Sequence, residues 1–157
     1  MIEIERKFLV TSKAFKDEAH KQIRIVQGFL NTDPERTVRV RLEGDKGILT
    51  VKGKSTNDGL SRFEWEKEIS KTDAKALLEL CEKDVIDKLR YEVDVGQHTY
   101  EIDEFYKDNE GLIIAEVELS HEDEAFEKPA WLGQEVTGDI RYYNSQLSKD
   151  PFKNWTL

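Results

Sequence analysis

Charged residues two positions apart recur along this sequence of 157 residues, and they are the side chains best suited to chemistry. They comprise eight acids and eight bases. The acids are Glu3, Glu5, Glu64, Glu66, Glu101, Asp103, Glu116 and Glu118. The bases are Lys7, Arg39, Arg41, Lys52, Lys54, Arg62, Lys88 and Arg90. Two charges at this spacing lie about 7 Å apart on one face of a strand.

The two kinds of pair suit two different partners. Paired carboxylates offer the oxygen ligands that Mg²⁺ and Mn²⁺ prefer. Paired arginine and lysine side chains offer forked donors for phosphate oxygens. A site that holds both would therefore bind a metal–polyphosphate complex. The metal would neutralise part of the phosphate charge, polarise the reacting phosphoryl group and activate water.

The charged positions alternate with apolar ones, which is the pattern of a β-strand. In the first ten residues, the apolar side chains of Ile2, Ile4, Phe8 and Val10 stand at even positions, whereas Glu3, Glu5 and Lys7 stand at odd positions. The same alternation predicts strands over residues 1–10, 22–30, 37–43, 48–54, 61–69, 84–95, 99–105 and 112–119.

An isolated Glu-x-Glu or Arg-x-Arg most often marks a solvated strand face. Here the pattern recurs over seven of the eight strands with both signs of charge. We therefore expect a mainly antiparallel α+β fold, an eight-stranded closed tunnel barrel with a charged lumen and a few flanking helices. Charges enclosed in this way must pair or bind ions.

The remaining segments predict short helices and packing residues. Helices are expected over residues 13–20, 70–81 and 140–147, with Thr72 as the N-cap of the second. Residues 120–126 resemble an acidic helical turn, and 129–133 a loop. Cys81 and Tyr142-Tyr143 are expected to pack, and Phe152 and Trp155 to dock the C-terminal segment. The three histidines are expected at the surface: His20, His98 and His121.

Composition limits the classes of partner. The net charge of −9 argues against broad binding to nucleic acid or anionic membranes. A lone cysteine and the lack of a long apolar run favour a cytoplasmic protein. The length favours a single domain over residues 1–157. Apolar outer strand faces that no helix covers would support a homodimer.

The motifs also occur in a recognisable order. Glu3-Ile4-Glu5-Arg6-Lys7 matches E-x-E-x-K, and R-V-R, V-K, E-W-E, K-L-R, E-I-D and E-V-E follow at residues 39–41, 51–52, 64–66, 88–90, 101–103 and 116–118. In this ordered set the chain resembles the CYTH superfamily, the triphosphate tunnel metalloenzymes. Its length is similar to that of the short bacterial members that hydrolyse inorganic triphosphate. The resemblance covers nearly the whole chain and implies an eight-stranded tunnel barrel.

Carried over by position, the resemblance implies a role for each motif residue. The implied ligands of Mg²⁺ or Mn²⁺ are Glu3, Glu5, Asp103, Glu116 and Glu118. The implied phosphate-binding residues are Lys7, Arg39, Arg41, Lys52, Arg62, Lys88, Arg90 and Arg141. The implied catalytic residues are Glu5, Lys88, Glu116 and Glu118, with Lys88 assisting the leaving phosphate. The implied supporting residues are Glu64, Glu66 and Glu101.

The resemblance implies divalent-metal-dependent hydrolysis of tripolyphosphate to pyrophosphate and phosphate. The chain has no obvious base- or thiamine-binding motif, which favours the inorganic substrate. A class IV-type adenylate cyclase and a thiamine triphosphatase are the alternatives within the family. A non-catalytic polyphosphate-binding module is the alternative of another class. Phe29 stands where some short members have Tyr, so a phenol-dependent step would not be available there.

Overall fold

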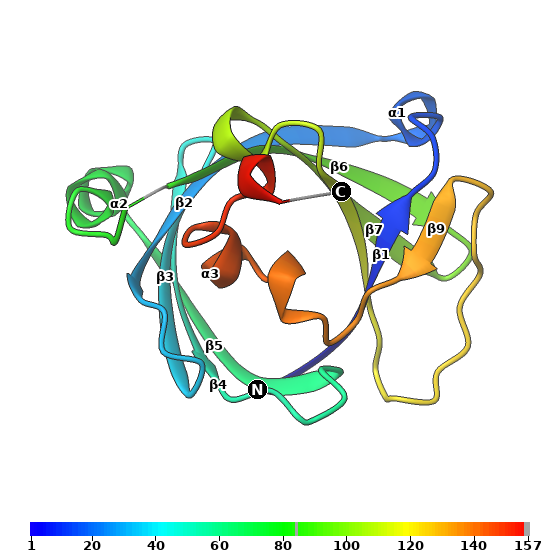
Figure 1. Ribbon diagram of the computed structural model, residues 1–157, viewed down its shortest axis with the longest axis horizontal. Helices are drawn as coiled ribbons and strands as arrows, with labels where there is room; N and C mark the ends of the chain where they lie inside the picture. The colour runs from blue at the N-terminus through cyan, green and yellow to red at the C-terminus, as the bar shows by residue number, and fades with distance from the viewer. Residues whose placement is uncertain (84, 156–157) are drawn as a thin grey trace.

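The main feature of the protein is a curved antiparallel sheet, seen in a computed structural model that describes residues 1–83 and 85–155 (Figure 1). The strands are β1 (Ile2–Val10), β2 (Lys21–Asn31), β3 (Arg36–Glu43), β4 (Lys46–Gly53), β5 (Ser61–Ile69), β6 (Ile86–Val95), β7 (His98–Phe105), β8 (Ile113–Glu118) and β9 (Leu132–Glu135). They are hydrogen-bonded in the order β5-β4-β3-β2-β6-β7-β8-β1-β9, and β5 also pairs with β1. The last pairing closes the first eight strands into the predicted antiparallel barrel.

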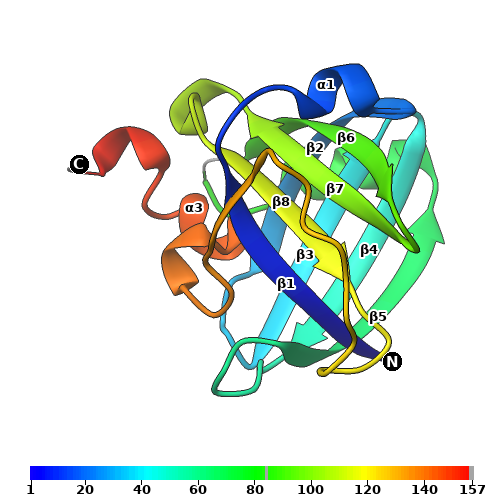
Figure 2. The same cartoon turned by 90° about the vertical axis from the view of Figure 1, so that its right-hand side faces the viewer.

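Strand β1 closes the barrel by pairing with different partners along its length. Residues 2–4 pair with residues 61–63 of β5, and residues 5–9 pair with β8. The end of β1 pairs with β9, which lies outside the ring (Figure 2). The sequence predicted a loop there, and that prediction is wrong for residues 132–133. Gly133 carries no alternation signal, and a Cβ at that position would lie only 3.1 Å from the carbonyl oxygen of Leu9.

The predicted alternation of the strands is confirmed, because the charged parity faces the barrel interior. Glu3, Glu5 and Lys7 of β1 all border the internal cavity. Phe8, on the other parity, is 1% exposed and belongs to an apolar cluster on the outside of the barrel wall. The usual arrangement of an apolar interior is therefore reversed in this part of the fold.

The outer apolar cluster supplies the core that the lumen lacks. It consists of outward-facing side chains of β1, β6, β7 and β8. Phe15 of α1 (Phe15–Glu18) and Trp131 pack on these side chains. The ring of Phe15 meets Tyr91 at 5.2 Å and Trp131 at 5.9 Å between centroids, both edge to face. Such aromatic contacts, added to the buried area, hold the short helix against the barrel.

A second apolar cluster closes one mouth of the tunnel. The inward parity becomes apolar there, since Ile86 and Phe105 lie two residues from Lys88 and Asp103 on their strands. Tyr142 and Leu147 of the C-terminal segment complete this cluster. In Figure 1 that segment, with α3 (Asn144–Leu147), crosses the opening of the barrel.

The helix predicted over residues 140–147 is instead a 3₁₀ turn (Ile140–Tyr142) followed by α3. A second 3₁₀ turn spans Lys107–Asn109, and a third spans Phe152–Asn154. Trp155 packs edge to face on both Tyr142 and Phe152, with centroid distances of 5.2 Å. The predicted docking of Phe152 and Trp155 is confirmed.

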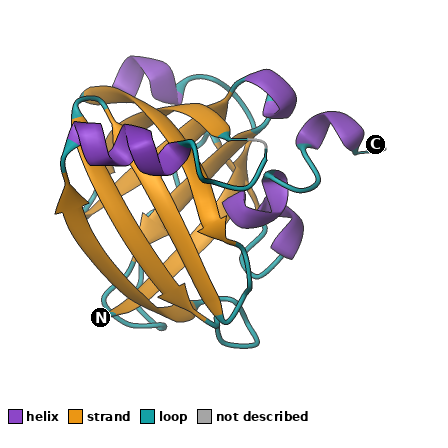
Figure 3. Ribbon diagram, turned by 90° about the vertical axis from the view of Figure 1, so that its left-hand side faces the viewer, coloured by secondary structure: helices purple, strands orange, loops and turns teal. Residues whose placement is uncertain are grey.

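Helix α2 (Lys71–Leu78) covers the outer wall (Figure 3), and its N-cap comes two residues before the predicted one. The hydroxyl of Ser70 accepts a hydrogen bond from the backbone N–H of Asp73, so Ser70 is the N-cap and the prediction of Thr72 is wrong. Two glycines allow the close approach of this segment. A Cβ at Gly47 would lie 2.8 Å from Ala74 Cβ, and one at Gly28 would lie 2.8 Å from Cys81 Cβ. Cys81 packs, as predicted.

Three further predictions are corrected. Helix α1 has four residues, fewer than residues 13–20 would give. Residues 121–124 form a turn, because the carboxylate of Glu124 accepts from the backbone N–H of Ser120 and pairs with His98. The His98 side chain is 11% exposed and is therefore not a surface residue. Asp84, the predicted start of a strand, lies outside the described residues.

No helix among residues 1–83 and 85–155 is long and apolar enough to span a bilayer.

Replacing Phe15 with alanine should unfold the protein more easily, because this ring is fully buried between α1 and the barrel wall. We expect Phe15→Ala to lower the free energy of unfolding by about 3–5 kcal/mol in urea titrations. The matched control is Phe63→Ala, which removes a ring that is 43% exposed. It should cost about 1 kcal/mol or less. Equal losses would contradict the assignment of the outer cluster as the main core.

Candidate active site

The barrel interior holds a cavity of about 310 Å³, within the size range of small-ligand sites. Its wall carries eight acids and seven bases. The acids are Glu3, Glu5, Glu43, Glu64, Glu66, Glu101, Glu116 and Glu118. The bases are Lys7, Arg39, Arg41, Lys52, Arg62, Lys88 and Arg90. The structure thus brings together every predicted site residue except Asp103 and Arg141.

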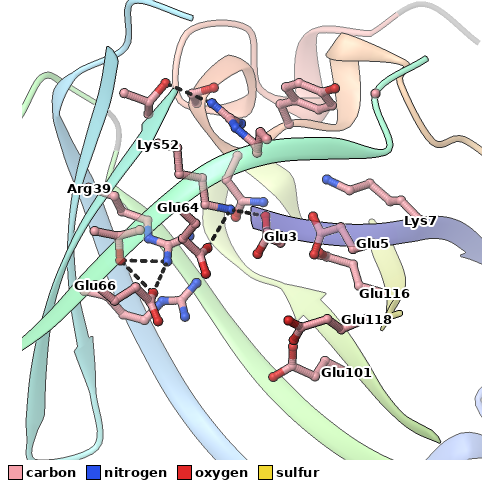
Figure 4. Close-up of a pocket in the computed structure, with 18 of the residues that line it drawn as sticks. Glu3, Glu5, Lys7, Arg39, Lys52, Glu64, Glu66, Glu101, Glu116 and Glu118 are labelled. Atoms are coloured by element: carbon pink, nitrogen blue, oxygen red, sulfur yellow. Dashed lines mark hydrogen bonds and ion pairs between the residues drawn. The ribbon is translucent and has the colours of Figure 1, made fainter. Parts of the chain in front are cut away.

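Some of these charges neutralise one another between different strands of the barrel (Figure 4). Lys52 lies between two carboxylates, with its Nζ 2.9 Å from Glu3 and 3.3 Å from Glu64. Arg39 contacts Glu66 at 3.3 Å, and the hydroxyl of Thr50 donates to the same carboxylate. These contacts offset part of the desolvation cost of placing acids and bases on one enclosed wall.

Three acids stand apart from this pairing. Glu5, Glu116 and Glu118 make no ion pair within 4.0 Å to any residue in the described ranges. They come from adjacent strands, since Glu5 is opposite Glu118 and Lys7 is opposite Glu116 in the β1–β8 register. Figure 4 shows Glu5 and Glu116 side by side.

The pair formed by Glu5 and Glu116 is electrostatically crowded. Burial, with the nearby charges of Glu116 and Glu3, raises the pKa of Glu5 well above its ordinary value. Burial also opposes ionisation of Glu116, but Lys7 and a hydrogen bond with Glu5 outweigh it and lower its pKa to about 2. The two neighbouring carboxyl groups therefore differ in acidity, and Glu116 is the stronger acid of the pair.

This donor set fits a hard divalent cation, because such a cation prefers carboxylate oxygens and its charge would relieve the repulsion between Glu5 and Glu116. Among residues 1–83 and 85–155, no three carboxylate, imidazole or thiol side chains already converge as a metal cage. Coordination would therefore require side-chain rotation or oxygens supplied by a ligand. Mg²⁺ commonly binds in the second way, through one or two carboxylates and substrate phosphates.

Several bases also keep donors for a ligand. Lys7 lies over the ring of Tyr143, with its Nζ 5.0 Å from the centroid, and Glu116 and Glu5 raise its pKa against the effect of burial. Arg62 donates to the carbonyl oxygen of Gly53. The Nε of Arg39 is buried and has no hydrogen-bond partner among the described residues. A buried donor without a partner is costly and suits an incoming anion.

Lys88 lies deepest among the bases, at 1% exposure. Its Nζ is 2.8 Å from Asp103 Oδ2 and 2.9 Å from Asn144 Oδ1. Burial, with Arg90 and Arg41 nearby, lowers the pKa of Lys88 to about 7, although Asp103 opposes the shift. A lysine so tuned can hold or release a proton near neutral pH.

Asp103 does not border the cavity, so the structure does not bring this predicted metal ligand together with the other acids. Its Oδ1 accepts from Arg90 Nε at 2.8 Å, and its Oδ2 accepts from Arg90 Nη2 at 2.9 Å and from Lys88. Burial opposes its ionisation, but Arg90 and Lys88 outweigh that effect and hold its pKa far below the ordinary range. Asp103 therefore supports the two bases from behind.

Arg141 is not brought to the cavity either, so the structure does not place it against a phosphate there. Its guanidinium forms an ion pair with Asp139 at 2.8 Å, and its side chain is 62% exposed. It also lies over the rings of Tyr142 and Trp155. Parity on a strand could not have located it, because it lies in a 3₁₀ turn.

Sequence reasoning missed several polar residues of the wall. Glu43 shares the inward parity of Arg39 and Arg41, so the same alternation could have found it. Four residues of the C-terminal segment had no comparable signal, since they lie outside the barrel strands. They are Thr137, Tyr143, Asn144 and Ser145.

The fold and the wall together define a class of protein: a closed antiparallel barrel whose tunnel wall carries both acids and bases. Comparison with known proteins gives the family. The CYTH domain matches residues 1–151, and the chain belongs to the CYTH family, which confirms the resemblance seen in the motifs.

Two relatives and one solved structure share this similarity. An inorganic triphosphatase of Acetivibrio thermocellus is 53% identical over 98% of this chain and 97% of its own. An inorganic triphosphatase of Nitrosomonas europaea is 37% identical over 94% of this chain and 97% of its own. A crystal structure described as that of an inorganic triphosphatase superposes with a TM-score of 0.67 at 33% identity, covering 93% of each chain.

Removing the charge of Asp103 should destabilise the fold rather than only the ligand site. Asp103→Asn leaves Lys88 and Arg90 buried without their shared counter-ion, and we expect a loss of about 3–5 kcal/mol in unfolding free energy. Glu101→Gln is the matched control. The Glu101 side chain is 42% exposed and forms one ion pair, with Arg90 at 3.0 Å. Its replacement should therefore lower the unfolding free energy by about 1 kcal/mol or less. Urea unfolding in EDTA compares the two, and equal stability would contradict the supporting role.

Proposed function

We propose that this protein hydrolyses inorganic triphosphate to pyrophosphate and phosphate in its tunnel, with Mg²⁺ or Mn²⁺. The observation that carries the proposal is the meeting of three unpaired acids with a row of bases around one enclosed cavity. The inorganic triphosphatase of A. thermocellus, similar along almost its whole length, supports the same activity.

The unpaired acids would hold the cation. Glu5, Glu116 and Glu118 carry the proposed metal-binding role, with Glu3 beside them. When bound, the cation offsets phosphate charge, polarises the reacting phosphoryl group and activates water. The carboxylates themselves orient an attacking water in line with the terminal phosphorus.

The bases would hold the polyphosphate. Seven of them border the cavity: Lys7, Arg39, Arg41, Lys52, Arg62, Lys88 and Arg90. Arginine forks suit phosphate oxygens, and Arg39 already has a buried Nε to donate. Lys88 would stabilise the leaving phosphate, and its pKa near 7 suits proton transfer to that group. The carboxylates of Glu64, Glu66 and Glu101 keep their basic neighbours in place.

The wall has little surface for an organic group. Its larger apolar or aromatic members are Phe29, Ile48, Leu60 and Tyr143. A bare triphosphate needs none of them, whereas adenine or thiamine requires apolar contact. Adenylate cyclase and thiamine triphosphatase activities are therefore less favoured than hydrolysis of the inorganic substrate. Phe29, which is 4% exposed, cannot contribute a phenol.

A phosphate-release screen tests the proposal against its alternatives. Purified protein with Mg²⁺ or Mn²⁺ should release one phosphate and one pyrophosphate from each tripolyphosphate. Its kcat/KM for tripolyphosphate should exceed that for ATP or thiamine triphosphate by at least about tenfold. Pyrophosphate release from ATP would instead indicate a cyclase. Binding of tripolyphosphate without turnover under either metal would indicate a non-catalytic polyphosphate-binding module and reject the proposal.

Neutralising Glu5 should remove both turnover and the response to metal. We expect Glu5→Gln to lower kcat by at least about a hundredfold, as loss of a group that acts in the transition state does. Mg²⁺ should raise the melting temperature of the wild-type protein, by preferential binding to the folded state, and raise that of Glu5→Gln much less.

The matched control is Glu68→Gln. Glu68 shares the parity of Glu64 and Glu66 on β5 but pairs with Lys46 outside the cavity, and its side chain is 65% exposed. This variant should keep wild-type turnover and the wild-type metal response. A Glu5→Gln protein with normal turnover would remove Glu5 from the metal site.

A further inference from the structure

The C-terminal segment places an amide directly on the deepest lysine of the tunnel. Asn144, the first residue of α3, accepts two hydrogen bonds through Oδ1. Lys88 Nζ of β6 donates one at 2.9 Å, and Gln27 Nε2 of β2 donates the other at 2.8 Å. One side chain from the closed mouth therefore bridges two strands of the barrel.

The orientation of both amides follows from their neighbours. Arg41 Nε donates to Gln27 Oε1 at 2.9 Å, and a guanidinium has no acceptor, so Gln27 must present its oxygen there. The amide nitrogen of Gln27 is then the atom that faces Asn144. A lysine ammonium also has no acceptor, so Asn144 must present its oxygen to Lys88. All three contacts agree on one arrangement.

Burial makes this arrangement hard to replace. Gln27 is 0% exposed and Lys88 is 1% exposed, so solvent cannot readily take the place of a lost partner. An ammonium has three donors. Asp103 and Asn144 accept two of them, and Lys88 also borders the cavity, where one donor remains for a ligand.

Helix α3 does not need the Asn144 side chain for its own structure. The N-cap is Tyr143, which makes no side-chain cap, and the backbone carbonyl of Asn144 accepts from the N–H of Ser148 at 3.1 Å. Tyr142 and Leu147 supply the apolar packing that closes the mouth. The polar group of Asn144 thus serves the lumen rather than the helix.

We propose that Asn144 is a positioning residue that holds the ammonium of Lys88 toward the phosphate-binding space, with Gln27 fixing the orientation of the Asn144 amide. The identity of the ligand rests on the proposed function. Without the amide oxygen, the Lys88 head group would turn about its remaining contact with Asp103. A phosphate oxygen would then meet a less ordered donor.

A double-mutant cycle on binding tests this role. Isothermal titration of tripolyphosphate in EDTA measures Kd without turnover for the wild type, Asn144→Ala, Lys88→Ala and the double variant. Asn144→Ala should raise Kd about tenfold, the effect of a lost hydrogen bond to a charged group. In the Lys88→Ala background the same change should raise Kd less than about twofold, because the group it positions is gone.

The matched control is Gln146→Ala, which removes another amide of α3 that does not border the cavity. It should leave Kd and the melting temperature unchanged. Asn144→Ser provides a second variant if Asn144→Ala does not fold, since serine is polar but too short to reach Lys88. Equal effects of the Asn144 change with and without Lys88, or no effect in either, would overturn the proposal.

The same titration separates this inference from the proposed function. A wild-type protein that binds tripolyphosphate but releases no phosphate with either metal would reject hydrolysis, while the cycle would still decide the role of Asn144. A wild-type protein that binds no tripolyphosphate in EDTA would overturn the role of Asn144, and one that also neither binds nor hydrolyses it with Mg²⁺ or Mn²⁺ would overturn both.

Discussion

The structure depends on compensating many charges that are enclosed in one barrel. Eight acids and seven bases border the same cavity, and each would cost several kcal/mol if it were left alone away from water. Ion pairs between strands, such as those of Lys52 with Glu3 and Glu64, offset part of this desolvation cost. The acids left over on β1 and β8 face bases that retain free donors. This residual set, rather than the pairs, is where we propose that a metal and a polyanion bind.

The rest of the fold follows from turning the charged parity inward. Apolar side chains then face outward, so the stabilising core has to be built on the outside of the wall. Helix α1, helix α2 and the segment around Trp131 provide that outer layer. The C-terminal segment closes one mouth with Tyr142 and Leu147 and adds polar groups to the wall. Catalytic space and stability are therefore supplied by opposite faces of the same strands.

Alternation made most of the barrel and its wall predictable from sequence, because most strands place their site charges on one parity, as Glu3, Glu5 and Lys7 are placed on β1. Alternation shows which face of a strand a side chain lies on, but not how deeply that side chain is buried. Asp103 has the inward parity of Glu101 but is covered by Lys88 and Arg90, which only coordinates can show. Alternation also gave no prediction for the C-terminal segment, because that segment contributes no strand to the barrel. Arg141 was therefore misplaced and Asn144 missed, since both depend on how a non-strand segment crosses the tunnel mouth.

The most direct test of the central claim is anomalous diffraction from crystals grown with Mn²⁺ and tripolyphosphate. The charge arrangement predicts a Mn²⁺ peak against the carboxylates of Glu5, Glu116 or Glu118, with phosphorus density between that peak and the Arg39 guanidinium. Manganese and polyphosphate bound only on the outer surface, with the tunnel free of both, would contradict it.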